Sequence, residues 1–238
     1  MATRPAAQKA SWEDIAARVI DSVLERRLGP GTRIGEADLA GVFHVSRTVV
    51  RQALGQLASQ GIVTVRPKRG WFVVVPSEAE VADVFAVRRI VETGLVREFI
   101  QGVTPAQVRV LRAHLTAQRR AIAAGDVATR SRLLNDFEVA IARQLGNALL
   151  TRVVADLTLR TVLVSMLYQT TREASASADD HEQILRAVEA RDERAAVRRI
   201  TQHLQNVEAG LQRRRSTEPV GQLRDTLDYH PAATTERS

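Results

Sequence analysis

Residues 36–61 read EADLAGVFHVSRTVVRQALGQLASQG and predict two short helices joined by a tight turn. The second helix begins after Ser46, a residue type that caps helices well, and Gly61 ends it. Its first turns carry hydroxyls and two arginines, the second of which is Arg51, while its opposite face is apolar. A helix of this kind suits the major groove of DNA, where arginine contacts guanine edges and phosphates. The stretch therefore predicts a helix-turn-helix.

The flanking residues complete a winged domain over residues 11–76. Apolar side chains between Trp12 and Leu24 recur at helical spacing, and the sequence LGPG then breaks the helix. Residues 62–66 and 70–75 are rich in β-branched side chains, and they predict two strands joined by the basic turn PKRG. Three helices followed by a basic hairpin form a winged helix-turn-helix.

The rest of the chain predicts helices alone. Thr104 and Pro105 mark one clear helix start, and residues 175–180 are small and polar, which favours a break. We expect a mainly α fold, with an N-terminal winged helix-turn-helix that contains a small β-hairpin and a C-terminal antiparallel bundle of about six helices. The expected helices span residues 78–101, 105–124, 125–145, 148–172, 180–190 and 192–214. Residues 77–214 would form this helical domain, with a flexible leader at 1–10 and a flexible tail at 215–238.

Composition narrows the class of protein. The 238 residues suffice for one large domain or two ordinary ones, and 45% hydrophobic with 26% charged residues is typical of a globular chain. The absence of cysteine excludes disulfides and thiolate metal sites, and it suits a cytoplasmic protein. No apolar run approaches the roughly 20 residues that span a bilayer, so we expect no membrane partner.

The net charge of +7 is unevenly distributed. Residues 1–76 hold eleven Lys and Arg against six Asp and Glu, whereas residues 77–238 hold twenty-three against twenty-one. The basic excess lies in the predicted winged domain, as expected if that domain meets a polyanion. A solvated basic surface is the ordinary alternative, so charge alone does not decide the function.

The first 75 residues resemble the GntR family of bacterial transcription regulators. The matching features occur in the family's order, and Val49 stands where the family usually has proline. They are Leu28-Gly29-Pro30-Gly31, Glu36, Leu39-Ala40, the run VSRTVVRQAL at 45–54, Leu57, Gly61-Ile62-Val63, and Pro67, Arg69 and Gly70. The remaining two thirds resemble the all-helical FCD-type effector domain of the FadR branch of that family. The matches there are residues 88–92, Phe137, Gly146-Asn147, residues 181–188, Asp192 and His203-Leu204.

The resemblance implies which residues contact DNA. Arg47 and Arg51 would contact bases and phosphates, and the hydroxyls of Ser46 and Thr48 would bond phosphate oxygens at the helix N-terminus. Arg69 and Gly70, at the tip of the wing, would enter the minor groove. For Arg47 and Arg51 the alternative is a solvated helix face, and for Ser46 it is an ordinary helix cap.

The resemblance also implies a divalent metal, held by an Asp, a His four residues later and two further His. Here Leu134 stands at the Asp position and Glu138 at the first His position, while His181 and His203 remain. Three interpretations stay open. Glu138, His181 and His203 could bind a metal such as Zn²⁺, they could bind an effector directly, or the histidines could be ordinary core residues.

The effectors of this branch are usually small carboxylates, which need a cationic partner or a metal. Arg88, Arg89 and Arg160 are the candidate pocket cations. Together these features predict a homodimeric, ligand-responsive regulator that binds a pseudo-palindromic double-stranded DNA operator, with repression the expected sign.

Two functions from other classes compete with this hypothesis. One is a metallohydrolase-like enzyme, but no nucleophile motif, phosphate loop or HExxH supports it, so we expect no enzymatic activity. The other is an architectural protein that coats DNA without sequence preference, and such a protein would not need an effector bundle.

Overall fold

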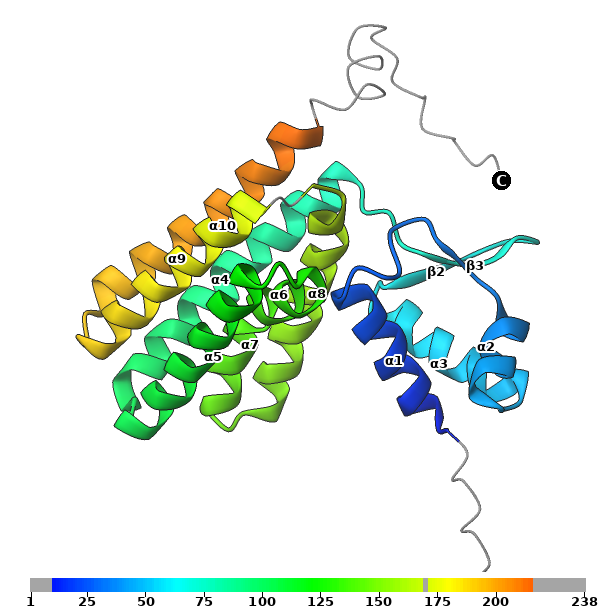
Figure 1. The fold of residues 1–238 in the computed structure, drawn as a ribbon, viewed down its shortest axis with the longest axis horizontal. Coiled ribbons are helices and arrows are strands. Elements are labelled where there is room, and N and C mark those ends of the chain that lie inside the picture. The colour runs from blue at the N-terminus through cyan, green and yellow to red at the C-terminus, as the bar shows by residue number, and fades with distance from the viewer. Residues whose placement is uncertain (1–9, 169–170, 216–238) are drawn as a thin grey trace, which may run out of the picture.

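The computed structural model describes residues 10–168 and 171–215. Except for Ala10 and Arg215, the expected leader and tail lie outside the described residues. The winged part and the helical part lie side by side, with the winged part at the right of Figure 1. In the described part of the chain, no helix combines the length and the apolar character that crossing a bilayer requires.

The winged part has three helices and a small antiparallel sheet. The helices are α1 (Trp12–Leu24), α2 (Glu36–Phe43) and α3 (Arg47–Ser59), and the strands are β1 (Arg33–Ile34), β2 (Val63–Arg66) and β3 (Gly70–Val73). The strand order is β1-β3-β2. β2 and β3 form the expected hairpin, in which Arg66 lies opposite Gly70. β1 escaped prediction because two residues are too few to show an alternating pattern.

Local signals explain where these helices begin and end. Ser11 and Asp14 form a reciprocal capping box at the start of α1. His44 ends α2 with a left-handed backbone, φ 54°. That conformation turns the chain sharply, so that α3 can begin only three residues later.

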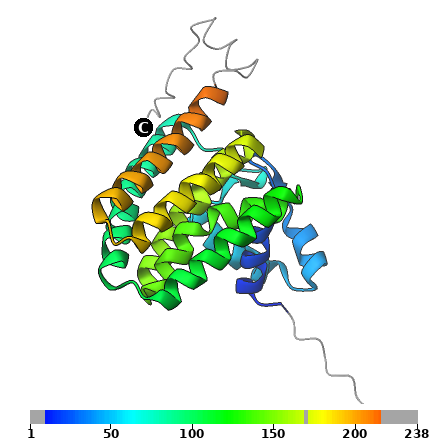
Figure 2. The ribbon, with the colours of Figure 1, turned by 60° about the vertical axis from the view of Figure 1, so that its left-hand side comes forward.

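Seven helices form the helical part of the described chain, rather than about six. They are α4 (Glu78–Gly102), α5 (Pro105–Ala123), α6 (Val127–Asn135), α7 (Phe137–Gln144), α8 (Ala148–Tyr168), α9 (Thr171–Glu189) and α10 (Glu193–Arg215). Figure 2 shows α9 and α10 side by side along the bundle, and the two helices pack against each other. Capping boxes at Ser77 and Thr104 begin α4 and α5.

Two boundaries differ from those expected. The single helix predicted over residues 125–145 is divided at Asp136, which ends α6 and begins α7. The polar segment at residues 175–180, predicted as a break, lies inside α9. Ala174 and Ala178 are buried beside Leu134, so tertiary packing outweighs the weak helix propensity of the neighbouring serines.

The cores of the two parts meet at α8. Leu159, Val162 and Leu163 of this helix belong to the same buried cluster as the apolar faces of α1 and α3. Polar contacts also cross the junction: Arg26 Nε donates to Ser131 Oγ at 3.3 Å, and Gln60 Nε2 donates to Asp156 Oδ1 at 3.4 Å. The helical part therefore supports the winged part directly.

Candidate functional site

The N-terminal end of α3 is an exposed surface with the chemistry of an anion site. Ser46, Arg47 and Thr48 are all exposed, and the first turn contains no acidic side chain. Ser46 occupies the N-cap position with an extended backbone, but its side chain makes no capping hydrogen bond. The hydroxyl and the first backbone N–H groups can therefore bind an anion such as a phosphate.

Arg51 is held in place without being buried. Its Nε donates to both carboxylate oxygens of Glu36, at 2.8 and 3.0 Å, and 66% of its side chain is exposed. Trp71 Nε1 donates to the same carboxylate at 2.9 Å. The Trp71 hydrogen bond and the Arg51 charge lower the pKa of Glu36. The carboxylate thus joins α2, α3 and β3, a role that sequence analysis missed because the three residues are far apart in the chain.

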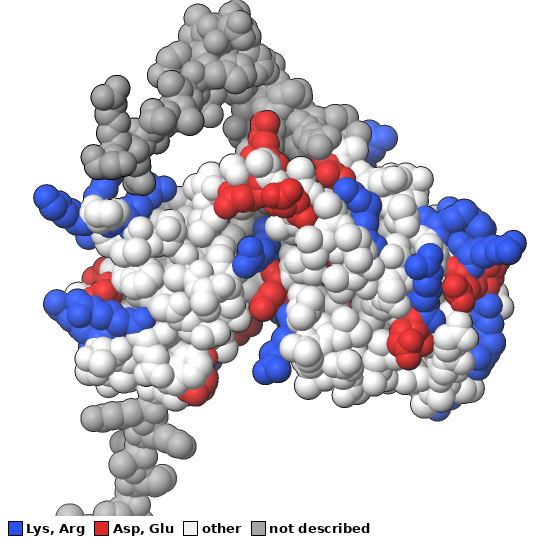
Figure 3. Space-filling model, turned by 180° about the vertical axis from the view of Figure 1, so that it is seen from behind, with Lys and Arg blue, Asp and Glu red and all other residues white. Residues whose placement is uncertain are grey.

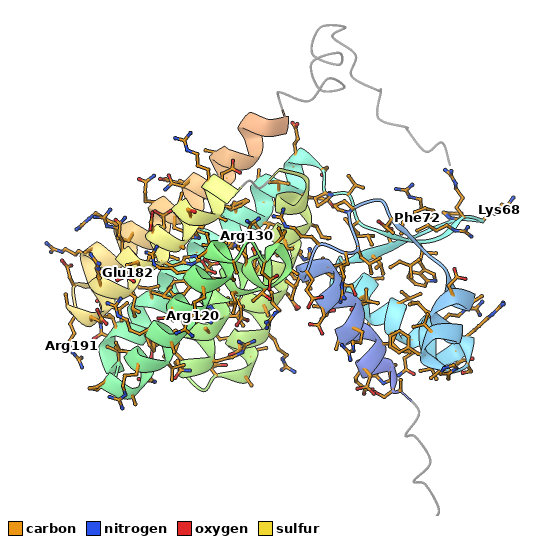
Figure 4. The ribbon with its side chains drawn as sticks, in the orientation of Figure 1. Lys68, Phe72, Arg120, Arg130, Glu182 and Arg191 are labelled. Carbon is orange, nitrogen blue, oxygen red and sulfur yellow. The ribbon has the colours of Figure 1, made fainter. Side chains whose placement is uncertain are left out.

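The wing presents further cations. Figure 4 shows Lys68 at the far end of the hairpin, where its backbone is left-handed, φ 61°. Arg69 beside it is exposed, and open space surrounds Gly70 where a side chain would stand. The Arg66 guanidinium lies 4.5 Å from the centre of the Phe72 ring. In Figure 3, basic side chains stand along the outer edge of the winged part, at the left of that view.

Three of the predicted pocket residues converge in the helical part. Glu138 of α7, His181 of α9 and His203 of α10 are all buried, and one potential ligand atom from each lies within 4.8 Å of the others. Glu138 Oε1 is 3.4 Å from His203 Nε2 and 3.9 Å from His181 Nε2. We call these three residues the histidine cluster.

Side-chain oxygens of residues outside the histidine cluster orient both of its imidazoles. His181 Nδ1 lies 3.1 Å from Gln118 Oε1, and His203 Nδ1 lies 3.3 Å from Asp180 Oδ2. An oxygen acceptor at Nδ1 favours the proton on that atom, which leaves Nε2 as the lone-pair nitrogen of a neutral ring. Phe137 stacks on His181 with 4.2 Å between ring centres. Both rings therefore direct Nε2 toward Glu138.

Of the predicted cations, only Arg88 reaches the cluster. Its Nη2 lies 3.7 Å from Glu138 Oε1, and its Nε donates to Glu92 at 2.6 Å. Arg89 instead pairs with Glu208 at 2.7 Å. Arg160 lies outside this cavity: its guanidinium is next to Gly61 of the winged part, and it lines a different cavity at the domain junction.

Charge is distributed unequally among the buried groups. Burial opposes the charged form of Glu138, but His203 and Arg88 outweigh burial and lower its pKa to about 2. Burial also opposes charge on His203, yet Asp180 and Glu138 raise its pKa to about 9. Burial and the neighbouring His203 lower the pKa of His181 to about 3. The surroundings thus favour charge on Glu138 and His203 and disfavour charge on His181.

The donor set fits a divalent metal ion. Ligand bonds of about 2.0–2.2 Å place neighbouring ligands of a tetrahedral zinc site about 3.4 Å apart, close to the spacings between Glu138 and the two histidines. Glu138 Oε1 and His181 Nε2 are buried and make no hydrogen bond within the described part of the chain. Such atoms are unusual in a satisfied core, which argues against ordinary core histidines. Leu134 lines the same cavity and supplies no ligand atom.

The space around the histidine cluster is small. The cavity that Leu134, Glu138, His181 and His203 line has a volume of about 30 Å³. That volume suits an ion or one or two water molecules. A metabolite with a carbon skeleton would enter only if neighbouring side chains moved.

Comparison with known families accounts for both parts of the chain. Residues 12–73 match the family described as bacterial regulatory proteins, gntR family, and residues 83–206 match the FCD domain. The chain belongs to the gntR family. Members of this family are DNA-binding transcriptional regulators, which are not enzymes.

Two curated relatives agree with this membership. The gntR-family chain is 31% identical to the HTH-type transcriptional repressor RspR of Escherichia coli K12 over 191 residues, which is 76% of this chain and 79% of RspR. It is 25% identical to the Uxu operon transcriptional regulator of the same organism, over 84% and 86% of the two chains.

The fold matches that of McbR/YncC from E. coli, with a TM-score of 0.77, 20% identity, and coverage of 87% of this chain and 99% of that one. A GntR transcriptional regulator from Rhodococcus sp. RHA1 gives a TM-score of 0.76 at 22% identity, over 84% and 97% of the chains. At these identities the similarity concerns the fold alone.

Proposed function

We propose that this protein is a ligand-responsive repressor of the FadR branch, which binds a pseudo-palindromic DNA operator as a homodimer. The observation that carries the proposal is the exposed start of α3, where Ser46, Arg47, Thr48 and Arg51 surround an uncapped helix N-terminus. The relative RspR is named a repressor, which supports the sign of regulation.

On DNA, α3 would lie in the major groove. Arg47 and Arg51 would contact bases and phosphates, while Ser46 and Thr48 would bond phosphate oxygens. The Glu36 carboxylate would pre-orient Arg51 through Nε, because it holds the guanidinium on an exposed helix face. The wing, with Arg69 and Gly70 at its tip, would follow the minor groove.

A homodimer would use the exposed apolar surface of α4. Val87 and Ile90 on this helix are 43% and 75% exposed. The neighbouring Arg89 forms an ion pair with Glu208 of the same chain. A two-fold axis places the same patch of each subunit against its copy, so a self-complementary apolar surface suits it. The symmetric dimer would in turn present two copies of α3 to the two half-sites of the operator.

The effector would act through the helical part. A divalent metal such as Zn²⁺ would be held by Glu138, His181 and His203, and Arg88 would supply a fixed positive charge beside it. When bound, the metal would supply a Lewis-acid position for the carboxylate of a small metabolite. A metabolite regulates DNA binding only if it binds one arrangement of the winged parts more tightly than the other.

The decisive test is selection of bound fragments from random DNA at physiological salt, because low salt increases non-specific binding. We expect a compact motif with two-fold symmetry. Fragments bound without any shared motif would favour the architectural alternative and contradict the proposal.

Substitution of Arg51 tests the docking of α3. Arg51→Ala should weaken operator binding by about 1–3 kcal/mol, roughly 5- to 150-fold, because a guanidinium contact to a base or phosphate is lost. Arg109→Ala, on an exposed position of α5, removes the same charge away from the DNA surface and should have little effect. Titration of a labelled operator measures both affinities, and equal losses would exclude the proposed docking.

A further inference from the structure

A third cavity, of about 320 Å³ and distinct from the one that Arg160 lines, lies where the two parts of the molecule meet. Its walls come from α1, α6, α7 and α8, together with Gln60 after α3. Figure 1 shows this junction, where α1 approaches α6 and α8. Val139 lines this cavity, whereas the preceding residue, Glu138, lines the histidine cavity. The two cavities therefore lie on different faces of α7, and we call the larger one the junction cavity.

Part of the lining of the junction cavity is apolar. Ile20 and Leu24 come from α1, Val139 comes from α7, and Ala155 and Leu159 come from α8. The volume lies at the lower end of the range of small-molecule sites, which is about 300–1,000 Å³. These apolar side chains suit a short hydrocarbon chain or an aromatic ring.

Three arginines also line the junction cavity: Arg132, Arg143 and Arg152. Arg143 pairs with Asp136 at 2.8 Å. The second carboxylate of the lining, that of Asp156, accepts a hydrogen bond from Gln60. Arg132 and Arg152 form no ion pair within the described part of the chain, and both are exposed. Three guanidinium groups against two carboxylates leave the lining positive, which suits an anion.

A buried hydroxyl in the same lining has no internal partner. Thr158 is only 2% exposed, and its Oγ1 makes no hydrogen bond within the described residues. Buried hydroxyls nearly always bond to protein, water or a ligand, because an unpaired one is unfavourable. This unpaired group is independent of the arginines and belongs to a residue that lines the junction cavity.

We propose that the junction cavity binds a small organic anion, namely a carboxylate carried by a short apolar chain or an aromatic ring. Arg132 and Arg152 bind the carboxylate, and the Thr158 hydroxyl donates a hydrogen bond to it. The apolar portion packs against Ile20 and Leu24 of α1. This site is separate from the histidine cluster and needs no metal.

Occupancy of the junction cavity would bias the position of the winged part. The ligand contacts α1 of the winged part and α8 of the helical part at once, so it stabilises the arrangement in which these walls are in register. Asn135 lines both the junction cavity and the histidine cavity, so the two sites are neighbours. This regulatory step rests on the proposed function, whereas binding itself does not.

Calorimetric titration of the full chain, in the absence of DNA, tests the site. The probe is 4-phenylbutyrate, and its neutral amide, 4-phenylbutanamide, is the control for charge. We expect the carboxylate to bind at least about tenfold more tightly than the amide, because only the carboxylate pairs with the arginines. No binding heat at millimolar carboxylate, or equal binding of the amide, overturns the proposal.

Three variants locate the bound probe. Arg132→Gln with Arg152→Gln should weaken binding about tenfold or more, whereas the matched double variant Arg198→Gln with Arg199→Gln, at exposed positions of α10, should bind like the wild type. Thr158→Val should bind the probe more weakly without a lower melting temperature, since it removes an unpaired buried hydroxyl. Equal losses in the two double variants would overturn the site.

Two further measurements separate this site from the proposed regulatory function. The probe should bind equally well in EDTA and in Zn²⁺, and loss of binding in EDTA would place the probe at the histidine cluster instead. The probe should also change operator affinity in the wild type. Normal, arginine-dependent binding with unchanged operator affinity would leave the site intact and contradict only its link to DNA binding.

Discussion

Leu134 decides how completely the histidine cluster can hold a metal. It is 4% exposed, lines the cluster's cavity and packs against Ala174 and Ala178. A leucine side chain has no ligand atom, so the protein offers three ligands from Glu138, His181 and His203 and leaves the remaining positions to water or an effector. The fixed charge of Arg88, 3.7 Å from Glu138, further reduces the attraction for a cation.

Restoring a carboxylate should strengthen metal binding. We expect Leu134→Asp to be less stable than the wild type in chelator, because a buried carboxylate lacks a partner. Zn²⁺ should stabilise this variant more than it stabilises the wild type, and the variant itself should gain about 2.7 kcal/mol at a hundredfold excess of Zn²⁺ over its dissociation constant. Melting curves with EDTA and with Zn²⁺ measure the difference. Leu134→Asn is the control for polarity, and an equal response of all three proteins would contradict a metal at this position.

Sequence analysis found the members of the histidine cluster but not their partners. Glu138, His181 and His203 follow from the family resemblance, because its motif fixes their order along the chain. Gln118 of α5 and Asp180 of α9 orient the rings, yet a single sequence carries no spacing signal that pairs these residues with His181 and His203. Glu92 is different, since its position four residues after Arg88 on one helix could have predicted the ion pair.

At the scale of elements, the helices of the winged part were predictable and two helix boundaries in the bundle were not. Ser11, Ser46 and the LGPG turn are local signals, and they place α1 and α3 within a residue or two. The division at Asp136 and the early start of α9 have tertiary causes. The buried alanines of α9 show the cause clearly, because they contribute no periodic pattern of large apolar residues and yet pack closely against α6.

The tight packing of α9 predicts different effects on stability when two nearby alanines are replaced by leucine. Ala178→Leu should destabilise the protein by about 1–3 kcal/mol, because the added carbons have no space beside Leu134. Ala176→Leu lies two residues away on an exposed face of the same helix and should be nearly neutral, since leucine and alanine both favour helices. Urea denaturation measures both changes. Equal stability of the two variants would mean that α9 does not pack as described.

At the scale of the whole molecule, α8 joins the two parts into one folding unit. Its residues Leu159 and Leu163 complete the core of the winged part, while Val154 of the same helix belongs to the core of the bundle. A signal in the helical part can therefore reach the winged part through one rigid element. The same shared core implies that neither part keeps its full stability when the other unfolds.

Cooperative unfolding of the two parts can be measured with intrinsic probes. Both tryptophans, Trp12 and Trp71, lie in the winged part, so their fluorescence reports on it, whereas far-ultraviolet circular dichroism reports mainly on the bundle. We expect both signals to show one common midpoint in urea. Leu163→Ala, at a fully buried position of α8, should reduce the free energy of unfolding by about 2–5 kcal/mol. It should therefore lower the urea midpoint of both signals.

A substitution far from the junction completes this test. Leu111→Ala, in the bundle core at α5, removes a side chain that is 1% exposed and has no place in the winged core. If the molecule unfolds as one unit, this variant should also lower the fluorescence midpoint, although both tryptophans lie in the other part. A shift in circular dichroism without a shift in fluorescence would show two independent domains. Signals from the effector part would then need a route other than the shared core of α8.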